Sequence, residues 1–182
     1  RLDTAVKEYG GLFFDADNLG FAGELRMEDG TKVSEKMLYD TINKMAKAEG
    51  ITYEQADKNI TTLEYGHREF HLREHNKDID AEIARLQGLA NPPPDVKSII
   101  KQLQESKIDL ALTDQEITDI EKQYQATPEA IYITKVKDAI RYNRIDALVA
   151  SGRISEDKAQ IWKDAAGYVP FDRLMQWDPA AP

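Results

Sequence analysis

The chain has 182 residues, of which 31% are charged and 41% hydrophobic, and it carries a formal net charge of −9 and no cysteine. The lack of cysteine excludes disulfides and thiolate metal sites, and the acidic balance argues against duplex nucleic-acid binding, which relies on Lys and Arg at phosphates. No stretch approaches the 18 apolar residues expected of a transmembrane helix. Because the chain begins at Arg1 without Met and stops at Pro182, we expect a segment of a longer protein.

The predicted elements are mainly helices, taken here in chain order. Before Ser34 several glycines interrupt the pattern, and the turn residues around Gly30 make a short hairpin one reading of this region. From Ser34, a possible cap, to Gly50 the apolar side chains recur at helical spacing, at Met37, Leu38, Ile42 and Met45.

Thr52 followed by Gln55 has the pattern of a capping box at the start of the next helix. We expect that helix to reach about His75. Its apolar pattern then leads either to a shorter continuation or to a separate turn that ends at Gly88. The three prolines at 92–94 follow, and no helix is expected to cross them.

The second half of the chain has clearer helix boundaries. A short helix from Val96 is followed by a capping box at Thr113 and Glu116. Proline directly after Thr127 favours the start of the longest helix, for which Ser151 and Gly152 are the stop signal. The last helix begins after Ser155, carries apolar Ala159, Ile161 and Trp162, and ends at Gly167.

These patterns predict an all-α fold, an irregular helical bundle with a short N-terminal region, hairpin-containing in one reading, and an extended C-terminal tail. The proline-rich linker at 91–95 divides the chain into an N-terminal helical region, 1–90, and a C-terminal helical region, 96–182. One compact unit formed by both regions is the alternative. We expect Tyr168 and Phe171 to pack around Trp162, because an extended apolar tail is costly to leave in water.

All three histidines of the chain lie four residues apart, at His67, His71 and His75, along one side of a predicted helix. Together with Glu74, the last two match the H-x-x-E-H pattern of inverted zincins, which bind zinc through two histidines. This makes the four residues a weak candidate for a metal site. The favoured interpretation is a solvated, charge-rich helix face that also carries Arg68, Glu69 and Arg73. No catalytic residues and no cofactor are expected.

The segment from Leu148 to Ser155 reads Leu-Val-Ala-Ser-Gly-Arg-Ile-Ser, and 168–173 reads Tyr-Val-Pro-Phe-Asp-Arg. This helix, turn, short helix and tail resemble a recurring segment of the large polyvalent and giant inner-virion proteins of tailed bacteriophages. The resemblance covers about 35 residues. The residues that carry the structural motif are Ser151, Gly152, Trp162, Tyr168, Pro170, Phe171 and Arg173.

The resemblance implies a non-catalytic helical scaffold or interaction module of a very long phage-encoded protein. Such proteins lie in the virion interior and enter the host cell with the genome. The implied partners are other modules of the same chain or other virion proteins, with no duplex nucleic acid and no membrane span. Two alternatives stay open: a metal-dependent hydrolase that uses the histidine helix, and a protein-binding module of an unrelated effector.

Overall fold

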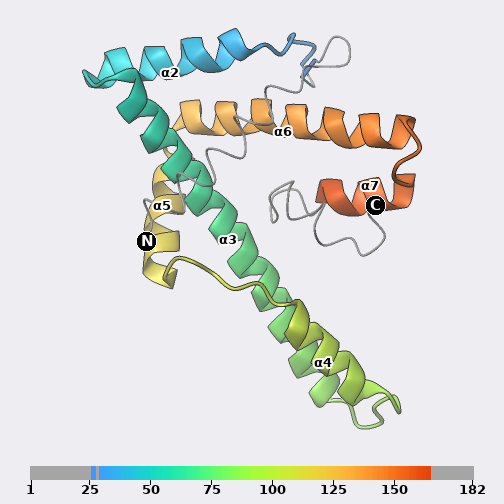
Figure 1. The fold of residues 1–182 in the computed structure, drawn as a ribbon. Coiled ribbons are helices and arrows are strands. Elements are labelled where there is room, and N and C mark those ends of the chain that lie inside the picture. Colours follow the sequence, from blue (N-terminus) through green and yellow to red (C-terminus); the bar gives the residue numbers. More distant parts are fainter. Residues whose placement is uncertain (1–25, 28, 165–182) are drawn as a thin grey trace.

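The computed structural model describes residues 26, 27 and 29–164. Within these residues the chain forms six helices and no strand longer than an isolated bridge (Figure 1). The helices are α2 (Glu35–Glu49), α3 (Tyr53–Gln87), α4 (Val96–Ser106), α5 (Asp114–Gln125), α6 (Pro128–Ala150) and α7 (Glu156–Asp164). The predicted all-α bundle is confirmed. Near the start, Arg26 and Lys32 form a single antiparallel bridge around a turn in which Gly30 has a φ of 83°.

Side-chain caps begin three of the helices where the sequence predicts a start. The hydroxyl of Thr113 accepts from the backbone N–H of Glu116, whose carboxylate accepts from the N–H of Thr113, so this capping box is complete. Ser155 accepts from the N–H of Lys158 in the same way. At α3 the box is only half formed, because Thr52 accepts from the N–H of Gln55 while the Gln55 side chain bonds to Asn59.

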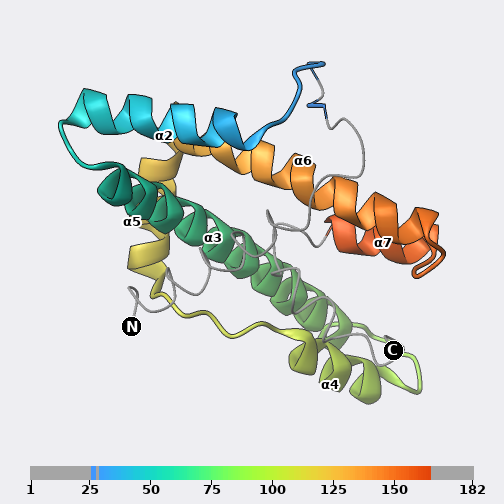
Figure 2. The same cartoon turned by 45° about the horizontal axis from the view of Figure 1, so that its top comes forward.

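Helix α3 is one continuous helix of 35 residues, so of the two alternatives predicted beyond His75 the structure shows the continuation. Its second half stays helical because Ile79, Ile83 and Leu86 recur at helical spacing and are buried. The proline loop then reverses the chain, and α4 packs along the distal end of α3 in both views (Figures 1 and 2).

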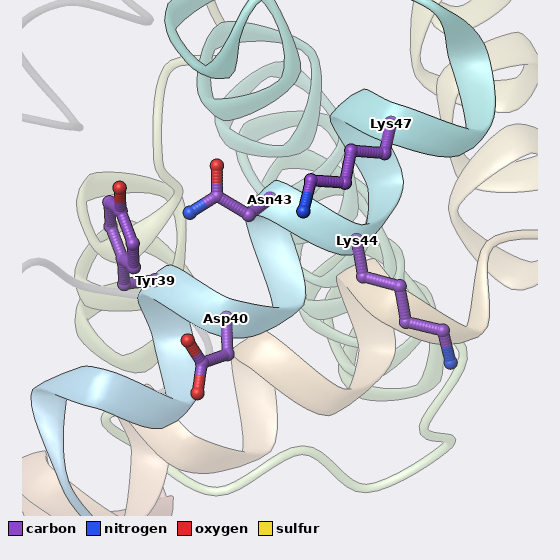
Figure 3. Close-up of a pocket in the computed structure, with 5 residues that line it drawn as sticks. All are labelled: Tyr39, Asp40, Asn43, Lys44 and Lys47. Carbon is purple, nitrogen blue, oxygen red and sulfur yellow. The ribbon is translucent and has the colours of Figure 1, made fainter.

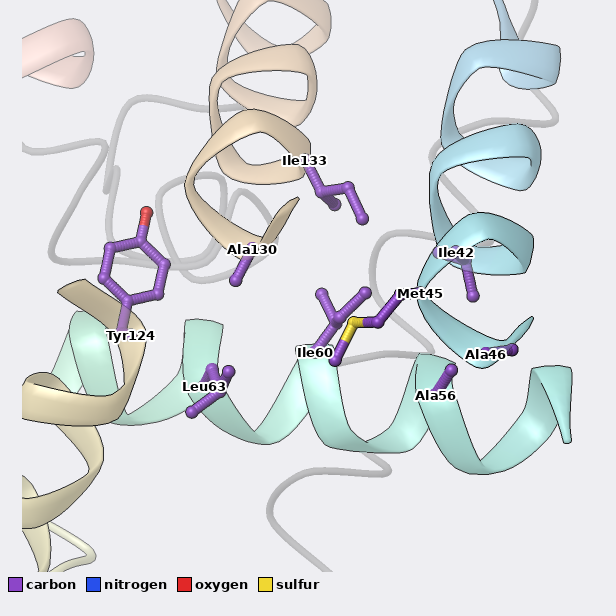
Figure 4. Packing of buried hydrophobic residues seen from close by; sticks show 9 residues of the cluster. All are labelled: Ile42, Met45, Ala46, Ala56, Ile60, Leu63, Tyr124, Ala130 and Ile133. Atoms are coloured by element: carbon purple, nitrogen blue, oxygen red, sulfur yellow. The ribbon is translucent and has the colours of Figure 1, made fainter. Parts of the chain in front are cut away.

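The main core joins helices from both sides of the proline loop (Figure 4). Ile42 and Met45 of α2 meet Ile60 of α3 and Ile133 of α6, and Tyr124 of α5 closes the cluster. A smaller cluster joins α6 and α7 through Ile145, Ala159 and Trp162. Helices α2, α3, α5 and α6 therefore form one packed body, from which the distal part of α3 extends with α4 (Figure 1).

Two polar side chains of α3 fasten the segment between α4 and α5. The amide of Asn76 donates to the carbonyl oxygen of Ile108 at 2.7 Å and accepts from its N–H at 2.9 Å. Two helical turns before Asn76, the carboxylate of Glu69 accepts from the backbone N–H groups of Ala111 and Leu112. The segment between α4 and α5 is not helical, so these side chains supply hydrogen-bond partners for its main-chain groups.

The turn between α6 and α7 has the geometry of a helix stop. Gly152 has a φ of 73°, and the N–H of Arg153 donates to the carbonyl of Leu148, as in a left-handed helix terminus. In α7 the side chains of Ala159 and Trp162 are buried, but Ile161, the third of the apolar residues named for this helix, is 64% exposed. The predicted tail residues Tyr168, Pro170, Phe171 and Arg173, and the stop at Gly167, lie outside the described residues.

Candidate functional site

A concentration of buried titratable side chains lies where α3 crosses α5 and α6. His67 of α3 points at α5, where its Nδ1 atom lies 2.7 Å from Oε2 of Glu121. The imidazole also stacks on the ring of Tyr124, with centroids 3.9 Å apart and planes inclined by 15°. His67 is therefore held on two sides by residues of α5, which are more than 50 positions away in the sequence.

The second histidine completes a pair on the same helix face. His71 lies one turn after His67, and the Nε2 atoms of the two rings are 3.1 Å apart. The ring centroids are 4.4 Å apart and the planes are nearly perpendicular, at 82°. An ionised Glu121 only accepts, so the network assigns the Nδ1 proton to His67, and a neutral His67 then has a lone pair on its Nε2. In the neutral pair, Nε2–H of His71 donates to this lone pair.

A buried carboxylate supports the pair from behind. Glu121 is only 8% exposed, and the amide of Gln125 donates to its second oxygen at 2.6 Å. Both oxygens of Glu121 are thus occupied by named donors, which compensates for removing the charge from water.

The surroundings favour a neutral imidazole at His71. Burial lowers the pKa of His71, and the neighbouring His67 lowers it further, while the carboxylates of Glu121, Asp138 and Glu74 act in the opposite direction. Burial also raises the pKa of Asp138 on α6, against the effect of Arg141 beside it. The pKa of the Tyr124 hydroxyl is raised to about 12, chiefly by burial, so this group stays protonated.

The structure separates the four predicted metal candidates. It brings His67 and His71 together, whereas the Glu74 side chain is 41% exposed and pairs with Lys77 at 2.8 Å. His75 lies a further turn along α3. In the part of the chain that the structure describes, no group of three or more His, Asp or Glu side chains is placed to hold a metal ion.

The expectation that this face of α3 is exposed to solvent is wrong for the residues at its centre. Glu69 is 2% exposed, and the side chains of Arg68 and Arg73 are 13% and 14% exposed. The cause is the segment before α5, which covers this face and uses Glu69 as an acceptor for two N–H groups. Helical spacing alone gives no sign of this covering segment.

A buried ion pair lies one turn before His67. Glu64 is 2% exposed and pairs with Lys137 of α6 at 2.6 Å, while the hydroxyl of Thr134 donates to its other oxygen at 3.1 Å. Neither Glu64 nor Glu121 is among the residues predicted from the sequence. Their only sequence signal is a glutamate at a position that the helical pattern assigns to the buried face.

An open hollow lies on the surface of α2 (Figure 3). Its lining residues, Tyr39, Asp40, Asn43, Lys44 and Lys47, all come from that one helix. A hollow formed by a single helix cannot enclose a small molecule as binding sites do.

Comparison with known protein families, curated proteins and solved structures finds no match to this chain. None of the described helices has the length and hydropathy needed to cross a membrane.

Proposed function

We propose that this chain is a non-catalytic helical scaffold and interaction module of a very long phage-encoded protein. The observation that supports a scaffold role is the use of its buried carboxylates. Glu69 binds a loop to α3, Glu64 joins α3 to α6, and Glu121 joins α5 to α3. Each of these groups bonds to the protein itself and serves to hold helices together.

The shape supports an interaction role. The distal half of α3 and the antiparallel α4 form an arm that leaves the packed body (Figure 2). Along α4, Ile99, Ile100 and Leu103 are only partly buried, so the arm offers a mixed apolar and charged surface. Neighbouring modules of the same chain or other virion proteins are the partners we propose for it.

The phage assignment rests on the resemblance of 148–155 and 168–173 to phage virion proteins. Within the first of these segments, Gly152 has a positive φ at the end of α6 and Ser155 caps α7. The location that we propose is the virion interior, followed by the host cell after delivery.

Mass spectrometry of purified virions tests this proposal directly. We expect peptides of this chain in particles that have been stripped of surface-bound protein, and in the host cell early after infection with synthesis blocked. Peptides found only in infected cells that are synthesising phage protein would contradict the virion role. Hydrolase activity that Glu74→Ala abolishes, with the fold unchanged, would contradict the non-catalytic role.

A further inference from the structure

The two Nε2 atoms of His67 and His71 are spaced as ligands of one metal ion. They lie 3.1 Å apart. Imidazole nitrogens bind zinc at about 2.0–2.1 Å, so an ion shared by both atoms would subtend an angle of about 100°. That angle lies between the values of octahedral and tetrahedral coordination.

The carboxylate of Glu121 contacts His67 in the way that carboxylates support metal-binding histidines. A histidine that binds a metal through one ring nitrogen usually donates its other N–H to a carboxylate, which fixes the tautomer and raises the basicity of the ligand. His67 makes this contact with Glu121 at 2.7 Å, and Gln125 in turn fixes Glu121. The stacked ring of Tyr124 also holds the imidazole plane.

We propose that His67 and His71 chelate one divalent transition-metal ion through their Nε2 atoms, with Glu121 as the positioning residue for His67. Imidazole ligands select zinc, copper, nickel or cobalt over magnesium and calcium. Among the described residues no third His, Asp or Glu completes the set, so the described part of this site supplies two ligands. This site goes beyond the proposed scaffold function and differs from the sequence-based expectation of no cofactor.

The competing explanation is a direct hydrogen bond between the rings. A head-on N–H···N bond places each ring centre a full ring radius behind its nitrogen. The centroid separation of 4.4 Å is too short for that arrangement at an N···N distance of 3.1 Å. The direct bond therefore departs from the head-on arrangement at one ring or at both, which weakens it. An ion replaces the bridging proton, which then resides on Nδ1 of His71.

Two matched substitutions on α3 separate the chelate from general histidine affinity. His71→Gln keeps a polar group at the pair but removes a nitrogen ligand, whereas His75→Gln removes the third histidine of the same helix. Glu121→Gln keeps the size of the positioning side chain and removes its charge. All variants are made in the full chain without a histidine tag, and their far-ultraviolet circular dichroism is compared with that of the wild type.

The measurement is a titration of the chelator-treated protein with Zn²⁺ by calorimetry, repeated with Co²⁺ by visible absorption. We expect one ion per chain in the wild type and in His75→Gln, and at least a tenfold loss of affinity in His71→Gln. Loss of a supporting carboxylate typically weakens metal binding about 10–100-fold, and we expect Glu121→Gln to fall in this range.

Three outcomes would overturn the proposal. They are no saturable binding, binding that His71→Gln leaves unchanged, and binding that His75→Gln weakens as much as His71→Gln. If Glu121→Gln fails to fold, the Co²⁺ absorption of His71→Gln against His75→Gln decides alone, because it reports nitrogen ligation directly. None of these outcomes bears on whether the chain is packaged in virions.

Discussion

Gly66→Ala is a substitution for which local helix propensity and tertiary packing predict opposite signs. Gly66 lies within α3, where a Cβ atom would be 2.6 Å from Cβ of Ile120 on α5 and nearer still to its Cγ2. In an exposed helix the change would stabilise the protein by about 1 kcal/mol. Here the overlap involves the root of the Ile120 side chain, so a rotamer change cannot relieve it and α5 must move.

Overpacking of this kind costs about 1–3 kcal/mol, and we take the upper end because the helices themselves must separate. After subtracting the propensity gain, we expect Gly66→Ala to lower the free energy of unfolding by about 2 kcal/mol. For a chain of this size that corresponds to a decrease in Tm of about 4–8 °C.

The assay is thermal and urea unfolding followed by circular dichroism. Gly88→Ala is the matched control, because a Cβ there would meet only ordinary contacts, the nearest at 3.5 Å, and its φ of −85° suits alanine. We expect the control to change stability by less than about 1 kcal/mol. In an Ile120→Ala background, Gly66→Ala should cost less than in the wild type. A rise in Tm for Gly66→Ala would refute close packing of α3 against α5.

Three further predictions follow from buried or capping groups. Lys137→Met should cost about 3–5 kcal/mol, because it leaves the charge of Glu64 buried without its cation; urea unfolding checks this, and adding Glu64→Gln should recover most of the loss. Thr113→Ala removes a helix cap and should cost about 1 kcal/mol, and an unchanged Tm would contradict the observed capping box. Burial raises the pKa of Asp57 above its usual value of 3.8, so near this pH the folded state binds more protons than the unfolded state. The free energy of unfolding therefore falls as the pH rises through the raised pKa. The free energy of unfolding of Asp57→Asn should therefore rise relative to that of the wild type from about pH 4 upward. A difference that does not change with pH would contradict this prediction.

Local signals in the sequence were sufficient to predict where most helices begin and end. Thr113 with Glu116, the proline after Thr127, and Gly152 each act through bonds to neighbouring backbone groups, so a short window contains all the information. Beyond His75 the sequence did not decide between a continuation and a separate turn, because polar residues weaken the helical pattern there. The structure shows the continuation, with α4 packed against it.

The candidate site was predictable only in part. The spacing of His67 and His71 places them on one helix face, and the structure brings these two together. Their partner Glu121 is 54 positions away from His67. Among the 33 acidic residues its only mark is a position on the face of its helix that the pattern assigns to the core. Gly66 is similar: in sequence it is a weak point in a helix, whereas its role is to let α5 approach.

The unbroken α3 also fixes the distance between its two ends and the direction in which each end faces around the helix axis. With a rise of about 1.5 Å per residue, its 35 residues span about 50 Å. A flexible chain of that length would have a fluctuating end-to-end distance of only about 30–35 Å. Whatever contacts the two ends of this helix is thus held at a constant separation. Each residue inserted into its distal half would advance α4 by about 1.5 Å and rotate it by about 100° around the axis. Helix α3 should therefore tolerate substitutions on its surface far better than insertions or deletions that change its length.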